Sequence, residues 1–136
     1  MTDKLFRAGF IIAGLANIVG ILAVTQGMTS STLYEQDPEV FSKFGILMIM
    51  LWGLAYIGTS RFATTAVLLP AAFAIEKLAY TLNWAFWMAE NGDKVNAIRE
   101  QDFLGGFFMG GYGINDGLFF VFFAVVTIVN LRRRSA

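Results

Sequence analysis

The sequence predicts an all-α fold: a polytopic membrane protein in which four transmembrane helices form an antiparallel bundle within one domain, residues 1–136. Two observations support this prediction. Hydrophobic residues make up 57% of the chain and charged residues only 15%, whereas a soluble domain carries about 25% charged residues. The hydrophobic residues are also gathered into four runs, each close to the roughly 20 residues that a helix needs to cross a bilayer.

The four predicted helices cover about 5–27, 41–60, 66–89 and 103–131. The first run is longer than the roughly 7–15 apolar residues of a signal peptide, so we expect it to be retained as a helix. Its glycines, Gly9, Gly14 and Gly20, favour the close approach of a neighbouring helix.

Residues 28–40 and 90–102 are hydrophilic, and we expect both to be connecting segments. In the first, Asp37-Pro38-Glu39 predicts the entry to the second helix, because proline fits a first helical turn and carboxylates suit the positive end of a helix dipole. Gly45 and Gly53 are eight residues apart and share one face of that helix. Only residues 60–65 separate the second run from the third, which predicts that these two helices are antiparallel neighbours.

Ionisable residues lie within two of the apolar runs: Glu76 and Lys77 in the third, and Asp116 in the fourth. A charge at the bilayer centre costs at least about 2.5–3.5 kcal/mol, so we expect each to have a partner. Glu76 and Asp116 each lie 13 residues from the outer end of their predicted helix, at Ala89 and Phe103. At about 1.5 Å per residue, both lie roughly 20 Å deep.

We therefore expect Lys77 and Asp116 to form an ion pair between the third and fourth helices. Neighbouring residues of a helix point about 100° apart, which leaves Glu76 as the unpaired acid and the best candidate for acid–base chemistry. The candidate catalytic set is Glu76, Lys77 and Asp116. Amides and aromatic residues near the same level are the candidate ligand-binding residues: Asn17, Trp52, Tyr56, Tyr80, Asn83, Tyr112 and Asn115.

The alternative is that these polar side chains only hold the helices together, since each interhelical hydrogen bond in a membrane contributes about 0.6 kcal/mol on average. Three ionisable groups are a costly way to do so, and intramembrane charges are more often functional.

The composition narrows the available chemistry. The chain has no Cys and no His, so it offers neither a thiolate nucleophile nor an imidazole base, and we expect no metal site and no cofactor. Its formal net charge is zero, and we expect no nucleic-acid partner. The expected partners are the lipid bilayer, a lipophilic ligand, and a second copy of the chain or another membrane protein.

Basic residues predict the orientation. Lys4, Arg7, Arg61 and the run 132–134 fall on one side of the predicted bundle, whereas Lys43, Lys94 and Arg99 fall on the other. Because basic residues are enriched in cytoplasmic segments, we expect a multi-pass protein of the bacterial inner membrane with both termini in the cytoplasm.

Four segments carry a resemblance to a known group: Asp37-Pro38-Glu39-Val40-Phe41-Ser42-Lys43-Phe44-Gly45, Leu51-Trp52-Gly53-Leu54-Ala55-Tyr56, Glu76-Lys77-Leu78-Ala79-Tyr80 and Gly113-Ile114-Asn115-Asp116. In these the chain resembles small uncharacterised bacterial four-helix membrane proteins, DoxX-like in outline. The resemblance implies the four-helix architecture and transfers no catalytic residue.

Three functional readings follow. In the first, the bundle binds or processes a lipophilic small molecule, of the quinone or isoprenoid class, at the Glu76, Lys77 and Asp116 cluster. In the second, it is a proton-coupled small transporter that works as a homo-oligomer. In the third, it is an accessory or structural subunit of a membrane complex.

Overall fold

A computed structural model describes residues 2–136, and all regular secondary structure in that range is helical, which confirms the all-α prediction. The elements in chain order are α1 (Thr2–Leu15), the π-helical segment η1 (Ala16–Gly20), α2 (Ile21–Val24), α3 (Thr32–Gln36), α4 (Lys43–Thr59), the 3₁₀ turn η2 (Ser60–Phe62), α5 (Leu68–Asn91), the 3₁₀ turn η3 (Gly92–Lys94), α6 (Val95–Gln101) and α7 (Phe103–Ser135).

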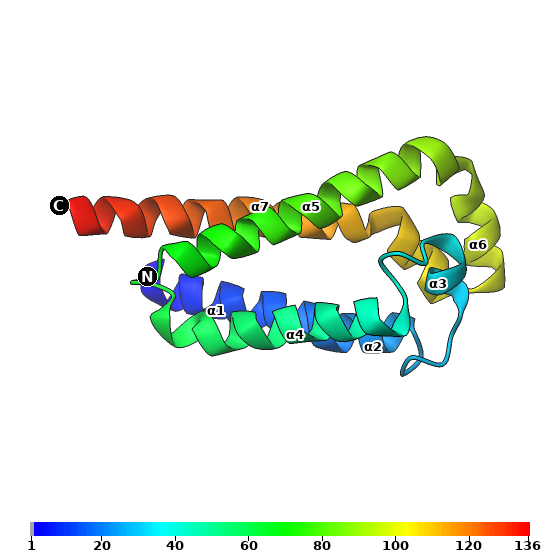
Figure 1. Cartoon of the computed structure of the whole chain (residues 1–136), viewed down its shortest axis with the longest axis horizontal. Coiled ribbons are helices and arrows are strands. Elements are labelled where there is room, and N and C mark those ends of the chain that lie inside the picture. The colour runs from blue at the N-terminus through cyan, green and yellow to red at the C-terminus, as the bar shows by residue number, and fades with distance from the viewer. Residues whose placement is uncertain (1) are drawn as a thin grey trace.

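The long helices are arranged as two pairs (Figure 1). The helix α5 packs along α7, and the continuous segment from α1 to α2 packs along α4. Both termini lie at one end of the molecule with η2, while α3 and α6 close the opposite end.

The predicted neighbours α4 and α5 are antiparallel, but their backbones do not make one of the close helix pairs. They contact each other through long side chains: the Tyr56 and Phe73 rings lie 4.8 Å apart between centroids, and Trp52 also packs on Phe73. The short connection thus joins antiparallel helices that contact each other, as predicted, but bulky aromatic residues hold their backbones apart.

Glycines set the two close pairings. A Cβ atom at Gly14 or Gly53 would collide with the backbone of the partner helix, so α1 and α4 approach closely only because both positions lack a side chain. A Cβ at Gly113 of α7 would collide with the Trp84 ring of α5. The prediction that Gly14 allows the close approach of a neighbouring helix is confirmed, whereas a Cβ at Gly20 would meet no atom within 4 Å, so that position makes no close contact.

Several predicted boundaries need correction. The second helix begins at Lys43, and Ser42 caps it by accepting a hydrogen bond from the Gly45 amide at 3.0 Å. The prediction of a helix entry at residues 37–39 is wrong, because these residues form a separate turn that ends before α4. In this turn the Val40 amide donates to Asp37 Oδ1 at 3.4 Å and the Phe41 amide to the Asp37 carbonyl at 2.9 Å, while Asp37 Oδ2 accepts from the Asn83 amide at 2.8 Å. The two hydrophilic connections also contain short helices, α3 and α6.

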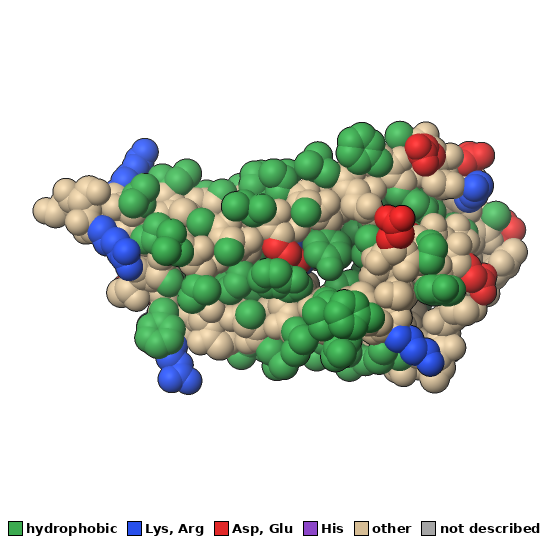
Figure 2. Space-filling model, viewed as in Figure 1, with side chains coloured by type: hydrophobic (Ala, Val, Ile, Leu, Met, Phe, Trp, Pro, Cys, Tyr) green, Lys and Arg blue, Asp and Glu red, His purple; other side chains and the backbone are tan. Residues whose placement is uncertain are grey.

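Three helical segments are long and apolar enough to cross a membrane: Thr2–Val24, Lys43–Phe62 and Phe103–Ser135. The fourth predicted span, α5, is not among them. Figure 2 shows hydrophobic side chains along the middle of the visible face and Lys and Arg side chains towards its two ends. This distribution suits a membrane-associated protein.

Two buried apolar clusters fill the interior, one towards each end. The first includes Phe10, Tyr56, Phe73 and Phe123, and the second includes Ile21, Phe41, Met109 and Tyr112. Within each long helical segment, the residues of the first cluster and those of the second occupy different stretches of the helix. A layer of buried polar side chains lies between them, formed by Asn17, Glu76, Lys77 and Asp116.

Candidate functional site

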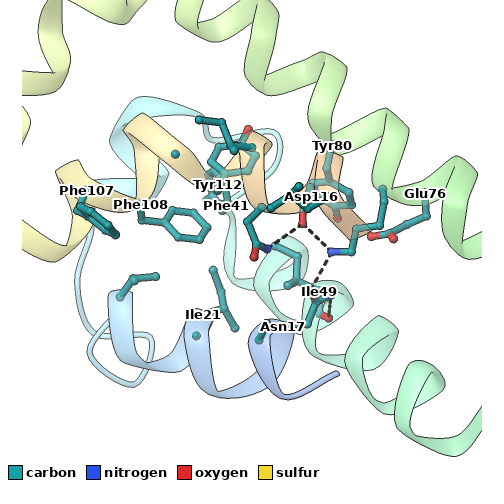
Figure 3. Close-up of a pocket in the computed structure, with 18 residues that line it drawn as sticks. Asn17, Ile21, Phe41, Ile49, Glu76, Tyr80, Phe107, Phe108, Tyr112 and Asp116 are labelled. Carbon is teal, nitrogen blue, oxygen red and sulfur yellow. Dashed lines mark hydrogen bonds and ion pairs between the residues drawn. The ribbon is translucent and has the colours of Figure 1, made fainter. Parts of the chain in front are cut away.

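The centre of this polar layer is the amine of Lys77, whose side chain is only 2% exposed. Its Nζ atom donates to Asp116 Oδ1 at 2.7 Å and to Asn17 Oδ1 at 2.9 Å. The predicted ion pair between α5 and α7 is thus confirmed, and Asn17 adds the first helical segment to it. Figure 3 shows Asn17 and Asp116 directed towards the same amine.

Asn17 sits in the π-helical segment, in which one helical turn holds an extra residue. Such segments often occur at functional sites. While its oxygen accepts from Lys77, its Nδ2 atom donates to the Ile49 carbonyl of α4 at 3.0 Å. One amide therefore links three helical segments, and both of its polar ends are satisfied.

Glu76 is buried on the neighbouring face of α5. The Tyr56 hydroxyl of α4 donates a hydrogen bond to Glu76 Oε2. The other oxygen, Oε1, is buried and has no hydrogen-bond partner within residues 2–136. Lys77 donates to Asp116 and Asn17 and makes no bond to Glu76, so the carboxyl that we predicted to lack a cationic partner does lack one.

A cavity of about 520 Å³ adjoins this layer. Its polar floor contains Asn17, Glu76, Lys77, Asn115 and Asp116, and its walls are largely apolar. Residues on its rim are exposed at the molecular surface: Phe107 (67%), Ile114 (60%) and Leu118 (69%). The cavity therefore connects an apolar outer surface with a polar interior, and all four long helical segments or their ends contribute to it.

The structure brings four of the predicted ligand-binding residues to the cavity: Asn17, Tyr80, Tyr112 and Asn115. Trp52, Tyr56 and Asn83 do not line it.

Tyr56 belongs to the apolar cluster nearer the termini, and only its hydroxyl reaches the polar layer. Trp52 packs against that same cluster. The Asn83 amide donates to Asp37 and to the hydroxyl of Tyr112, which lines the cavity.

Sequence reasoning missed several wall residues: Ile21, Phe41, Ile49, Phe107 and Phe108. The Phe108 ring stacks on the Tyr112 ring, with centroids 5.1 Å apart, and Tyr112 follows Phe108 by four positions in α7. This spacing places both rings on one face of the helix, so the sequence could have indicated that Phe108 lies beside Tyr112. Phe41 lies in the turn before α4, and no helical periodicity pointed to its contact with Tyr112 at 5.4 Å.

The arrangement suits hydrogen bonding and charge recognition more than metal coordination. Within residues 2–136, no three side chains of the His, Cys, Asp or Glu type are grouped so that they could hold a metal ion. The groups that face the cavity are carboxylates, an amine, amides and phenols.

Comparison of the chain with protein-family models, with curated proteins and with solved structures found no match.

Proposed function

We propose that this chain is an integral membrane protein that binds a lipophilic small molecule in the 520 Å³ cavity, with the polar head of that molecule at the Glu76, Lys77 and Asp116 cluster. The observation that carries the proposal is the gradient within one cavity, from an exposed apolar rim to a buried charged floor. Small-molecule sites have this character: mostly apolar walls with a few placed polar groups.

We further propose that all four long segments cross the membrane as an antiparallel bundle. With 24 residues, α5 is about 36 Å long at 1.5 Å per residue, which is enough to span the hydrocarbon core. Its two central charges are buried against the other helices, while apolar residues such as Ile75, Leu82 and Phe86 are exposed. A lipid-facing surface on α5 would therefore be apolar.

The proposed location is the bacterial inner membrane, with both termini in the cytoplasm. The arrangement of basic residues supports this, because the two termini and the turn that holds Arg61 lie at one end of the molecule.

A quinone or an isoprenoid is the ligand class to test first, because each combines an apolar body with a small polar head. Gly111 lines the cavity, and a Cβ atom added there would meet no atom within 4 Å. We expect Gly111→Leu to fill the cavity and weaken binding of a decyl quinone at least tenfold, measured by isothermal titration in detergent.

The control is Gly58→Leu, which adds the same side chain at an equally open position of α4 away from the cavity. It should bind the quinone like the wild type. Equal binding by wild type and Gly111→Leu would place the ligand elsewhere and reject this site.

A proton-coupled transporter acting as a homo-oligomer is the second candidate, favoured by the unpartnered Glu76 oxygen. In that case Glu76→Gln should abolish pH-driven uptake by reconstituted vesicles. Uptake that persists in this variant would exclude Glu76 as the proton carrier.

A further inference from the structure

The buried polar layer contains one more acid than base. Lys77 is the single cationic side chain among the cavity-lining residues, while Glu76 and Asp116 are both carboxylic acids. The titratable groups around Glu76 are Lys77 and Tyr80 on its own helix, Tyr56 on α4 and Asp116 on α7. Neither phenol supplies a positive charge. If Glu76, Asp116 and Lys77 are all ionised, this layer therefore has a net charge of −1.

An uncompensated charge is costly to hold inside hydrocarbon or a packed protein. The layer is therefore stable only when a proton or another cation offsets the second carboxylate. A proton on Glu76 would do this when the cavity holds no cation. A cationic ligand in the cavity would make that proton unnecessary.

Carboxylate oxygens remain open for such a ligand. Asp116 Oδ1 accepts from Lys77 and Asn115, while Asp116 Oδ2 makes no hydrogen bond within residues 2–136. Glu76 is only 9% exposed, and its Oε1 atom has no hydrogen-bond partner in the described part of the chain. Both residues line the same cavity.

The cavity walls also suit a cation with an apolar body. Phe41, Tyr112 and Phe108 form a contiguous aromatic group, with centroid distances of 5.4 Å and 5.1 Å. Tyr80 and Phe107 line the same space. Aromatic faces attract cations, and do so more strongly where water is excluded.

We propose that the ligand of this cavity is a lipophilic monocation, an organic ammonium or phosphonium ion with an apolar body, which competes with one proton for the excess carboxylate of the Glu76 and Asp116 pair. This inference rests on the proposed binding function and narrows its head group from neutral to cationic. When the cation binds, one proton leaves the site.

The test uses tetraphenylphosphonium, which is permanently charged and has no N–H group, with the full chain in detergent micelles. Isothermal titration between pH 5 and 9 gives the dissociation constant, and buffers of different ionisation enthalpy give the number of protons released. In the acidic range, where the site holds its proton, the dissociation constant should fall about tenfold per pH unit as pH rises, with one proton released. Affinity independent of pH, with no proton release, would overturn the inference.

The variant that removes the excess charge is Glu76→Gln, which is close to isosteric and still accepts the Tyr56 hydrogen bond. It should weaken tetraphenylphosphonium binding at least tenfold and remove its pH dependence. Glu90→Gln is the matched control, since Glu90 is exposed near the end of the same helix, and it should match the wild type.

The two proposals fail separately. If neither the phosphonium nor the quinone binds to the wild type, the proposed function fails. If only the quinone binds, or if Glu76→Gln binds the phosphonium as the wild type does, the cationic head group is rejected and the binding function stands. Should Glu76→Gln fail to fold, the pH profile and proton count of the wild type still decide the question.

Discussion

At the scale of single residues, the decisive group is the Lys77 amine, because its bonds connect helices that are far apart in the sequence. It reaches Asp116 on α7 and Asn17 in η1, and Asn17 in turn reaches α4. A buried amine of this kind is stable only while its carboxylate partner is present. Removing one partner leaves an uncompensated charge in a low-dielectric interior.

The Lys77 and Asp116 pair can be tested by a double-mutant cycle. We expect Lys77→Met alone or Asp116→Leu alone to lower the free energy of unfolding by about 3–5 kcal/mol, whereas the double variant loses much less. Thermal unfolding in detergent, followed by circular dichroism, measures all four proteins. Additive losses in the double variant would show that the two side chains do not stabilise each other.

Asp102 lies just outside the proposed membrane-spanning segments, and its hydrogen bonds lead to a prediction about the pH dependence of stability. The Gly105 amide donates to Asp102 Oδ1 at 2.9 Å, and this hydrogen bond, with further ones from Thr32 and Ser30, lowers the pKa of the Asp102 carboxyl. A lowered folded-state pKa contributes stability that is complete above the unfolded value, near 3.9, and is lost as pH falls through the folded value.

We therefore expect wild-type thermal stability to fall below about pH 4 in part through Asp102. Asp102→Asn should keep the helix cap, because asparagine caps as well as aspartate, but should show a shallower loss of stability with acid. Melting temperatures of both proteins from pH 3 to 7 measure the difference. Identical profiles would assign the acid sensitivity to other carboxyl groups.

At the scale of elements, glycines decide which helices pack backbone to backbone. The α5–α7 pair is close at Gly113 because the Trp84 ring occupies the space where a side chain would be, and the Trp84 indole N–H donates to the Met109 carbonyl at 2.9 Å. The ring therefore has little freedom to move aside. Two residues earlier in α7, Gly111 faces open space.

These two glycines give a matched pair of substitutions in one helix. We expect Gly113→Ala to destabilise the protein by about 1–3 kcal/mol, since it overpacks a tight contact. Gly111→Ala should be neutral or stabilising by up to about 1 kcal/mol, because alanine favours the helix more than glycine does. Equal effects in thermal unfolding would contradict the packing at Trp84.

At the scale of the whole molecule, the two helix pairs splay around a central polar layer, with one apolar cluster towards each end. The first pair closes at Gly14 and Gly53 and the second at Gly113, while aromatic side chains bridge the space between them. On the side of α2 and α7, aromatic side chains do not fill the whole space between the two pairs, and the cavity lies there.

The proposed topology is testable with single cysteines, because the natural chain contains none. We expect Thr2→Cys and Ser135→Cys to react with a membrane-impermeant maleimide from the same side of the membrane. Asn96→Cys in α6 should react only from the opposite side. Labelling of intact cells and of inverted vesicles separates the two sides, and reaction of all three from one side would exclude the four-span arrangement.

Much of the fold could be predicted from the sequence, because apolar run length and charge placement act locally. The four runs correspond to four long helical segments, and the final one was placed to begin at Phe103, where α7 begins. The Lys77–Asp116 pairing also followed, since counting residues from the helix ends gives the position of each residue along the bundle and helical rotation gives its direction. Both are fixed by regular helix geometry.

The rest depended on contacts that no local pattern encodes. Tyr56 was expected at the ligand site but fills an apolar cluster, and Phe41 was not expected but forms a cavity wall. Which side chains meet depends on how far the helix pairs splay, and that distance results from many packed residues on all four segments. The sequence by itself therefore determined the helical class and the partner of Lys77. Only the tertiary structure decided which helices pair, where the π-helical turn places Asn17, and where the cavity opens, because these depend on side-chain volumes summed across helices and not along them.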